Sequence, residues 1–192
     1  NRKLLDLDLN FEDFKAVSNN VLMGNLGNFC FRTLSFASKN FETGFDGIAK
    51  GDNEEKLMKE FWNLVDKPHG IKDSYYNLDY KSAIKQILNI SDMGNVYFQK
   101  LEPWKKRESV EDQKIVASKI CFMVNLVRNL SVLIKPVMPD FSAKIEKSFG
   151  VEAVLGNGEV DGNSVGTGLS WGALGFDWDS SVKLCDKLVE KV

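Results

Sequence analysis

Histidine and cysteine are scarce in this chain of 192 residues, and their scarcity excludes two classes of catalytic site. The only histidine is His69, and the three cysteines, Cys30, Cys121 and Cys185, lie far apart among apolar residues. Neither a metal-ligand spacing nor a Ser-His-Asp arrangement can be assembled from them. We therefore expect no metal site, a loop position for His69, and buried cysteines of a cytoplasmic protein, because a reducing compartment keeps thiols free.

Long apolar runs and an excess of charge of one sign are also missing. No run approaches the ~20 apolar residues that cross a bilayer, and the first residues lack the apolar core of a signal peptide. With 25 basic and 27 acidic residues the net charge is only −2, which excludes a purely electrostatic nucleic-acid binder and makes any basic surface local. We expect no membrane partner and no DNA partner. Because the chain starts at Asn1 instead of methionine, we also expect it to be part of a longer polypeptide.

The apolar residues follow a helical period over most of the chain and predict an all-α bundle of about five helices. The expected helices cover residues 11–40 after an Asn10 cap, 52–67 from Asp52, about 77–101, 110–135 after a Ser109 capping box, and 141–149 from Asp140. We assign residues 1–150 to this bundle. Residues 151–192 form a C-terminal extension rich in glycine and tryptophan, with a final short helix that packs on the bundle or on a missing catalytic domain.

A polar line on an otherwise apolar helix is the first candidate site. Asn25, Asn28 and Arg32 are spaced i, i+3, i+7, so an α-helix places them on one stripe. The asparagines either satisfy polar groups between packed helices or form a recognition edge, and the pattern leaves both interpretations open. Gly24 and Gly27 each cost about 1 kcal/mol relative to alanine inside a helix, which indicates the close approach of a neighbouring helix or a ligand.

A tryptophan within the densest basic cluster is the second candidate site. Pro103 ends the preceding helix and holds Trp104 in a rigid connection, and the basic residues around it are Lys100, Lys105, Lys106 and Arg107. Stacking of a nucleic-acid base on an open indole face is worth ~1–3 kcal/mol, and neighbouring lysines hold phosphates. The alternative is a Trp104 that folds back on the core, with solvated lysines around it.

Together these motifs resemble the anticodon-binding helical domain of methionyl-tRNA synthetase. The similarity is carried by residues 24–32 (Gly-Asn-Leu-Gly-Asn-Phe-x-x-Arg) and 94–105 (Gly-Asn-x-Tyr-x-x-x-x-Glu-Pro-Trp-Lys), with support from residues 6–14 and 133–139. It extends from about Asp6 to Gly150. The resemblance implies that Trp104 stacks on the first anticodon base while Asn28 and Arg32 hydrogen-bond its edge, reading the cytosine of CAU. Single-stranded loops are recognised in this way, by stacking splayed bases and pairing with their edges.

The same resemblance implies supporting roles for Asn25, Pro103 and the basic cluster, with the anticodon loop of tRNA(Met) as partner. It also implies that ATP and Mg act in the catalytic domain of the parent enzyme and that this part needs no cofactor. The class I signatures of that catalytic domain, of the His-Ile-Gly-His and Lys-Met-Ser-Lys-Ser kinds, are absent from the sequence. We therefore expect this chain to be inactive alone.

Two alternatives stay open. The first is the equivalent domain of another class I synthetase, for leucine, valine, isoleucine or cysteine, against which the Glu-Pro-Trp sequence at residues 102–104 argues. The second is a non-enzymatic helical scaffold that docks a protein along the polar stripe between Ser18 and Lys39.

Overall fold

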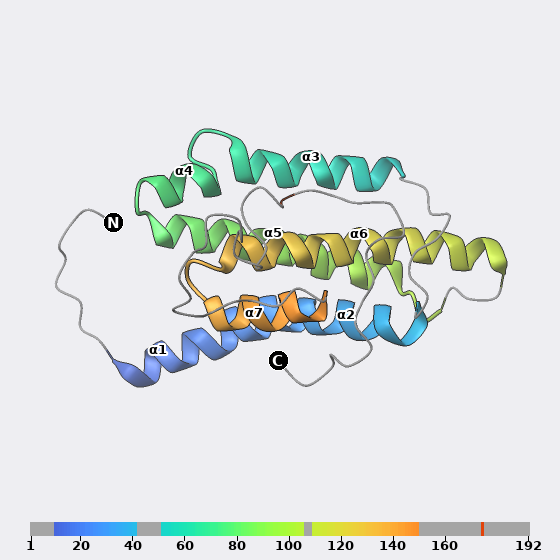
Figure 1. The fold of residues 1–192 in the computed structure, drawn as a ribbon, viewed down its shortest axis with the longest axis horizontal. Helices are drawn as coiled ribbons and strands as arrows, with labels where there is room; N and C mark the ends of the chain where they lie inside the picture. Colours follow the sequence, from blue (N-terminus) through green and yellow to red (C-terminus); the bar gives the residue numbers. More distant parts are fainter. Residues whose placement is uncertain (1–9, 42–50, 106–108, 150–173, 175–192) are drawn as a thin grey trace, which may run out of the picture. The chain divides into compact units, whose positions relative to one another are not determined.

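The computed structural model describes residues 10–41, 51–105, 109–149 and 174, and its regular secondary structure in those ranges is entirely helical (Figure 1). The elements are α1 (Phe11–Val17), the π-helix η1 (Ser18–Gly27), α2 (Asn28–Asn40), α3 (Asp52–Asp66), α4 (Ile71–Tyr76), α5 (Tyr80–Leu101), α6 (Val110–Ile134) and α7 (Pro139–Ser148). The all-α prediction is confirmed. The predicted final helix and almost all of the glycine-rich extension lie outside the described residues.

The first helical run is as long as the sequence predicts, but its middle is not α-helical. The elements α1, η1 and α2 follow one another without a break from Phe11 to Asn40, and the Glu12 amide donates to Asn10 Oδ1 at 3.0 Å, so Asn10 is the expected cap. Between them, η1 has the i→i+5 hydrogen bonds of a π-helix over ten residues, an uncommon length. It contains the two interior glycines, whose weak α-helical preference lowers the cost of leaving the α-helical pattern.

The predicted Ser109 cap at the start of α6 is confirmed. Ser109 is the N-cap residue, its Oγ accepts a hydrogen bond of 3.0 Å from the Asp112 amide, and it donates to the Asp112 carboxylate at 2.6 Å. The first of these bonds satisfies a backbone donor that the helix leaves unpaired, and the second takes the Asp112 carboxylate to the Ser109 hydroxyl, whereas in a capping box it accepts from the Ser109 amide.

The predicted start of α3 at residue 52 is confirmed, but α7 starts two residues before the predicted residue 141, and the expected cap residue of each helix is wrong. The N-cap residue of α3 is Gly51, so Asp52 lies inside the first turn, where its negative charge favours the helix dipole. Similarly, α7 begins with Pro139 after Met138, so Asp140 is a first-turn residue and not the cap. The fixed φ of proline suits the first helical position, which moves the start upstream.

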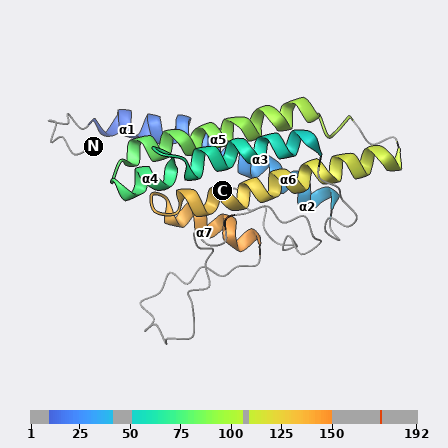
Figure 2. The same cartoon turned by 90° about the horizontal axis from the view of Figure 1, so that it is seen from above.

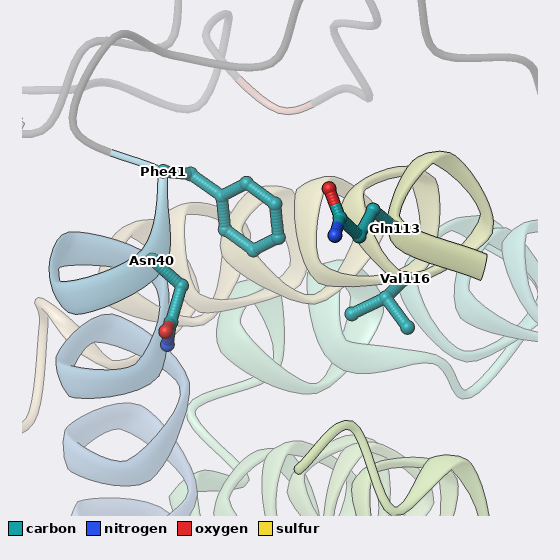
Figure 3. Close-up of a pocket in the computed structure, with 4 residues that line it drawn as sticks. All are labelled: Asn40, Phe41, Gln113 and Val116. Carbon is teal, nitrogen blue, oxygen red and sulfur yellow. The ribbon is translucent and has the colours of Figure 1, made fainter. Parts of the chain in front are cut away.

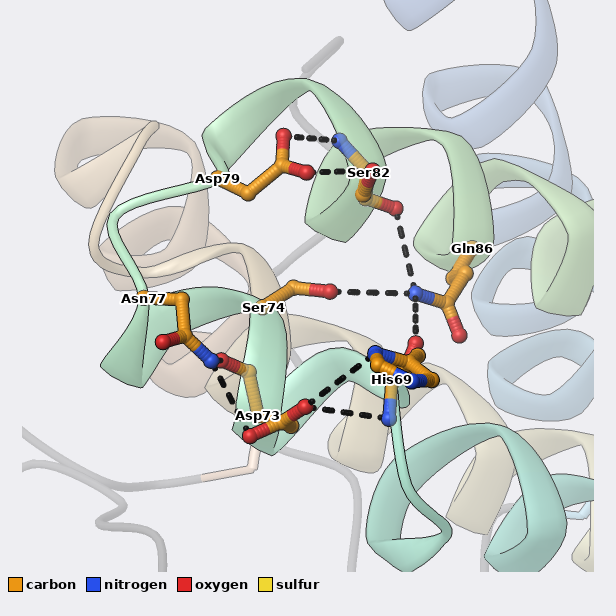
Figure 4. Close-up of polar contacts among 7 residues, drawn as sticks. All are labelled: His69, Asp73, Ser74, Asn77, Asp79, Ser82 and Gln86. Carbon is orange, nitrogen blue, oxygen red and sulfur yellow. Dashed lines mark hydrogen bonds and ion pairs between the residues drawn. The ribbon is translucent and has the colours of Figure 1, made fainter. Parts of the chain in front are cut away.

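The chain between α3 and α5 contains α4, a short helix that the sequence analysis did not predict, and α5 therefore starts later than expected (Figure 4). Asp79 lies directly before α5 and accepts hydrogen bonds from the Ser82 hydroxyl at 2.8 Å and the Ser82 amide at 3.1 Å. These bonds lower the pKa of Asp79. From α5, Gln86 Nε2 donates to the His69 carbonyl at 3.1 Å, which ties down the exposed turn in which His69 was expected.

The chain divides into two compact units. One contains Asn1–Phe29 and Lys50–Leu101, and therefore α1, η1, α3, α4 and α5. The other contains Cys30–Ala49 and Glu102–Val192, and therefore most of α2 with α6 and α7. The assignment of residues 1–150 to one domain and 151–192 to an extension stays a prediction.

In the first unit, η1 packs on α5, and α4 packs on both α3 and α5 (Figures 1 and 2). The chain approaches α5 closely at Gly94: a Cβ atom there would lie only 2.3–2.8 Å from three ring atoms of Phe29. The Phe29 ring is fully buried and rests directly on the backbone of α5. Only a glycine leaves room for it, which explains why a glycine interrupts this otherwise regular helix. Farther along, the Tyr97 hydroxyl donates to the carboxylate of Glu54, which joins α5 to α3.

The second unit is built on α6, which contains most of its buried apolar residues. Its residues from Ile120 to Val127 are all buried. Within the described part of the chain it is the one helix long and apolar enough to cross a membrane, but 78% of its most apolar window is buried inside the protein. A core helix passes the same length and composition test. From α7, the Ser142 hydroxyl donates to the Ser131 carbonyl of α6 at 2.8 Å.

A partly buried ion pair also joins these two helices at their shared corner. Lys135 Nζ lies 2.9 Å and 3.0 Å from the two carboxylate oxygens of Glu146, a residue with no exposed surface. A carboxylate in this position is stabilised only while its partner is present.

The expectation of buried cysteines is confirmed for the two that the structure describes. Cys30 and Cys121 are free and buried, and burial raises the pKa of the Cys30 thiol far above its usual range. Cys185 lies outside the described residues.

Replacing Gly94 by alanine should destabilise the protein by about 1–3 kcal/mol, because the added methyl group overlaps the Phe29 ring and neither helix backbone can give way cheaply. Urea unfolding followed by circular dichroism measures this loss. The matched control is Gly27→Ala, where the nearest atom is the flexible end of Met23 at 3.4 Å, so stability should stay within about 1 kcal/mol of wild type. Equal effects of both changes would contradict the close approach.

Replacing Lys135 by methionine should cost about 2–4 kcal/mol, because it leaves the buried Glu146 carboxylate without its cation. The control, Lys144→Met, removes an exposed lysine of the same helix pair and should change the unfolding free energy by less than about 0.5 kcal/mol. A Lys135 variant as stable as the control would show that the ion pair contributes nothing.

Candidate nucleic-acid interface

The polar stripe predicted for residues 25–32 divides where η1 meets α2. Asn25 is in η1, and its side chain is directed at α5: Nδ2 donates to Asp92 at 2.7 Å, and Oδ1 accepts from the Ser91 hydroxyl at 2.8 Å and from Asn95 Nδ2 at 3.2 Å. We call Asn25, Ser91, Asp92 and Asn95 the Asn25 network. For Asn25, the interpretation as a residue that satisfies polar groups between packed helices is therefore confirmed.

Asn28 differs from Asn25 in that its side chain is exposed. It is the first residue of α2, and Arg32, which is partly exposed, lies four residues later on the same helix. One α-helical turn separates them, so the two side chains follow one edge of α2. This edge presents an amide with a donor and an acceptor next to a guanidinium with donors only.

Trp104 stands in a tight turn directly after α5. Glu102 has a φ of 44°, in the left-handed region, and its carbonyl accepts from the Lys105 amide at 2.9 Å. The helix thus ends just before Pro103, as the sequence analysis expected, and Glu102 leaves the right-handed helical region. Pro103 is buried and anchors the turn, while the side chain of Trp104 remains 51% exposed. The indole is therefore not folded back into the core.

The basic cluster around Trp104 is described only in part. Lys100 in the last turn of α5 and Lys105 in the turn are exposed, whereas Lys106 and Arg107 lie outside the described residues. Lys105 Nζ lies 2.7 Å from the carboxylate of Glu102, so part of its charge is already balanced. This exposed pair is weak and screened by salt, which leaves the lysine free to exchange its partner for a phosphate.

The predicted residues are divided between the two compact units. Asn25, Asn28 and Lys100 belong to one, whereas Arg32, Pro103, Trp104 and Lys105 belong to the other. Their roles toward a nucleic acid and their convergence at one base stay predictions.

The structure adds residues that the sequence analysis did not assign to the site. Ser91 and Asp92 were not singled out, and Asn95 was noted only as part of a motif. Their signal in the sequence is a set of polar side chains at i, i+1 and i+4, beside Gly94, within an amphipathic helix. Among the described residues, no group of histidine, cysteine, aspartate or glutamate is arranged to hold a metal ion.

Each unit also has a surface hollow. One, of about 160 Å³, lies where the end of α2 meets the start of α6 and is lined by Asn40, Phe41, Gln113 and Val116 (Figure 3). The other, of about 370 Å³, lies between α3 and α5 and includes Leu57, Val96, Tyr97 and Lys100 among its lining residues. Of the predicted site residues that the structure describes, Lys100 lines the hollow between α3 and α5. Asn28, Arg32 and Trp104 are instead presented on the edge of α2 and in the turn after α5.

Comparison with protein families decides between the remaining interpretations. A family model described as the anticodon binding domain of methionyl tRNA ligase matches residues 45–163, more than half of the chain. The chain belongs to this family. The resemblance stated from the sequence is thus confirmed, and the methionine family is supported over the other class I synthetases.

Two curated relatives of this anticodon-binding domain are methionine–tRNA ligases. The protein of Borrelia turicatae is 30% identical over 188 residues, which is 97% of this chain and 24% of the relative. That of Methanospirillum hungatei is 30% identical over 152 residues, covering 79% of this chain and 22% of the relative. The chain therefore spans about a quarter of the length of these relatives.

Solved structures support the fold. The apo form of methionyl-tRNA synthetase from Mycobacterium tuberculosis matches 92% of this chain and 33% of its own, with a TM-score of 0.73 and 23% identity. The same enzyme bound by methionyl-adenylate gives a TM-score of 0.67 at 22% identity, over 92% of this chain and 32% of its own.

Replacing Trp104 by alanine should lower the free energy of unfolding by no more than about 1 kcal/mol, because half of its surface is already in water. Thermal unfolding of the two proteins measures the difference. The control is Trp62→Ala, which removes a less exposed ring in edge-on contact with the fully buried Phe61, at 5.2 Å between centroids. That change should cost about 2–4 kcal/mol. A larger loss at Trp104 than at Trp62 would make Trp104 a core residue.

Proposed function

We propose that this chain reads the CAU anticodon of tRNA(Met) as the anticodon-binding domain of a methionyl-tRNA ligase. The observation that carries the proposal is Trp104, a half-exposed indole held in a tight turn by a buried proline, in a chain of this family. A rigid, open aromatic face binds an unstacked base without first paying the entropy of ordering a flexible side chain.

Each residue has a distinct task in this proposal. Trp104 stacks on the first anticodon base. Arg32 supplies donors to the carbonyl oxygen and ring nitrogen of cytosine, and Asn28 supplies an acceptor for its exocyclic amine. Uracil presents a different edge, with a ring N–H donor and a carbonyl in place of the amine, so the same residues disfavour it. The cations of Lys100, Lys105, Lys106 and Arg107 hold the phosphates of the loop without reading sequence.

The chemistry of aminoacylation belongs to a separate part of the enzyme. We propose that the parent protein attaches methionine to tRNA(Met) with ATP and Mg in its catalytic domain, in the cytoplasm, and that this domain needs no cofactor of its own. The methionyl-adenylate in a structure of the M. tuberculosis synthetase supports that chemistry for the parent enzyme.

Tryptophan fluorescence tests the proposal directly. At one fixed salt concentration, an anticodon stem-loop with CAU should quench the fluorescence more strongly and at lower concentration than a stem-loop with a changed first base. The difference should vanish in Trp104→Ala. Equal quenching by both stem-loops, together with equal affinity in a competition assay, would contradict CAU recognition.

Replacing Arg32 by alanine should lower the free-energy difference between binding the CAU stem-loop and one with a changed first base by ~1–3 kcal/mol. This is the usual size of a good base-edge contact, a figure taken from DNA readout. The measurement is the ratio of dissociation constants for the CAU and changed stem-loops. Lys100→Ala is the control, because a phosphate contact weakens both complexes equally and leaves the ratio unchanged. If Arg32→Ala behaved like the lysine variant, Arg32 would be a phosphate or scaffold residue.

A further inference from the structure

The Asn25 side chain has no acceptor capacity left for a nucleic acid. A side-chain amide oxygen has two lone pairs, and those of Asn25 Oδ1 are both used by Ser91 and Asn95 of α5. Its amide nitrogen donates to the Asp92 carboxylate at 2.7 Å. Asn25 is therefore a residue of the helix–helix contact.

The position of this contact along the chain gives it a consequence for recognition. Asn25 lies in η1, three residues before Asn28, and pairs with α5 through the Asn25 network. Phe29, the residue after Asn28, contacts the backbone of α5 at Gly94. One contact is polar and directional, and the other is steric. Together the two contacts fix how the junction between η1 and α2 is rotated about its own helix axis and where it lies along α5. The exposed Asn28 is held between the two contacts.

We propose that Asn25 is a positioning residue, which acts through the Asn25 network to set the direction in which Asn28 projects. A recognition side chain has to be held within about 0.5 Å and 10–20° of its productive geometry. A slip of one residue turns an α-helix by about 100°, far more than this tolerance. The inference rests on the proposed function and adds the contact that orients Asn28, one of its base-reading residues.

A charge exchange between Asn25 and Asp92 isolates this role. Asn25→Asp puts a second carboxylate next to Asp92 where an amide now donates, so the two helices repel each other at this point. Asp92→Asn in the same chain restores a donor and an acceptor across the contact, and Ser91 and Asn95 still donate to the residue at position 25. Asp92→Asn alone keeps an acceptor for Asn25.

The quantity to measure is the dissociation constant for a stem-loop with a changed first base divided by that for the CAU stem-loop, on the full 192-residue chain. General destabilisation lowers both affinities by the same folded fraction and leaves the ratio unchanged. We expect Asn25→Asp to reduce the ratio by about tenfold, the effect of losing one good base contact, and the double variant to recover it to within about twofold. Asp92→Asn alone should stay near wild type.

Gln86→Ala is the matched control, because Gln86 donates from α5 to the His69 carbonyl and the Ser74 hydroxyl, which belong to the same unit but not to the Asn25 network. The Gln86→Ala protein should be less stable than wild type but should keep the wild-type ratio of dissociation constants. A wild-type ratio in Asn25→Asp, in a wild-type protein that does discriminate, would overturn the positioning role alone. A wild-type protein that does not discriminate would overturn the proposed function as well. Loss of the ratio without recovery in the double variant would also overturn the role of the Asn25–Asp92 contact.

Discussion

The contact between the Phe29 ring and the backbone at Gly94 is the constraint on which the first compact unit depends. A Cβ atom at position 94 would lie 2.3 Å from the nearest ring atom, so the helices are as close as their backbones and one ring permit. Polar groups beside such a contact lose access to water to the extent that they are buried, and they then need partners in the protein. Ser91 is buried, Asn25 and Asn95 are half-buried, and these three residues pair with one another.

This constraint separates two asparagines that look equivalent in the sequence. Asn25 has its acceptor filled by α5, whereas Asn28, at the start of α2, is exposed. A half-buried network thus supports an exposed recognition edge, and the buried Pro103 does the same for Trp104. In both places a rigid anchor next to an open polar or aromatic group suits recognition of an unstacked base, because little entropy is lost on binding.

Much of the fold was predictable from the sequence. Helical periodicity gave the all-α class and five long helical runs, and local chemistry gave the Asn10 and Ser109 caps. The π-helical segment and α4 were missed because apolar spacing does not report which hydrogen bonds the backbone forms. The pairing of Asn25 was left open because it depends on residues about 66–70 positions away. The polar side chains beside Gly94 are visible in the sequence, but their spacing does not say which residue of another helix they contact.

The most direct measurement of the central claim is the NMR response of the side-chain amides when a CAU stem-loop is added to the protein. If Asn28 reads the base while Asn25 serves the helix contact, the Nδ2 resonances of Asn28 shift strongly and those of Asn25 keep their positions. A stem-loop with a changed first base leaves Asn28 much less affected. Strong shifts at Asn25 with none at Asn28, or equal responses to both stem-loops, would contradict the account.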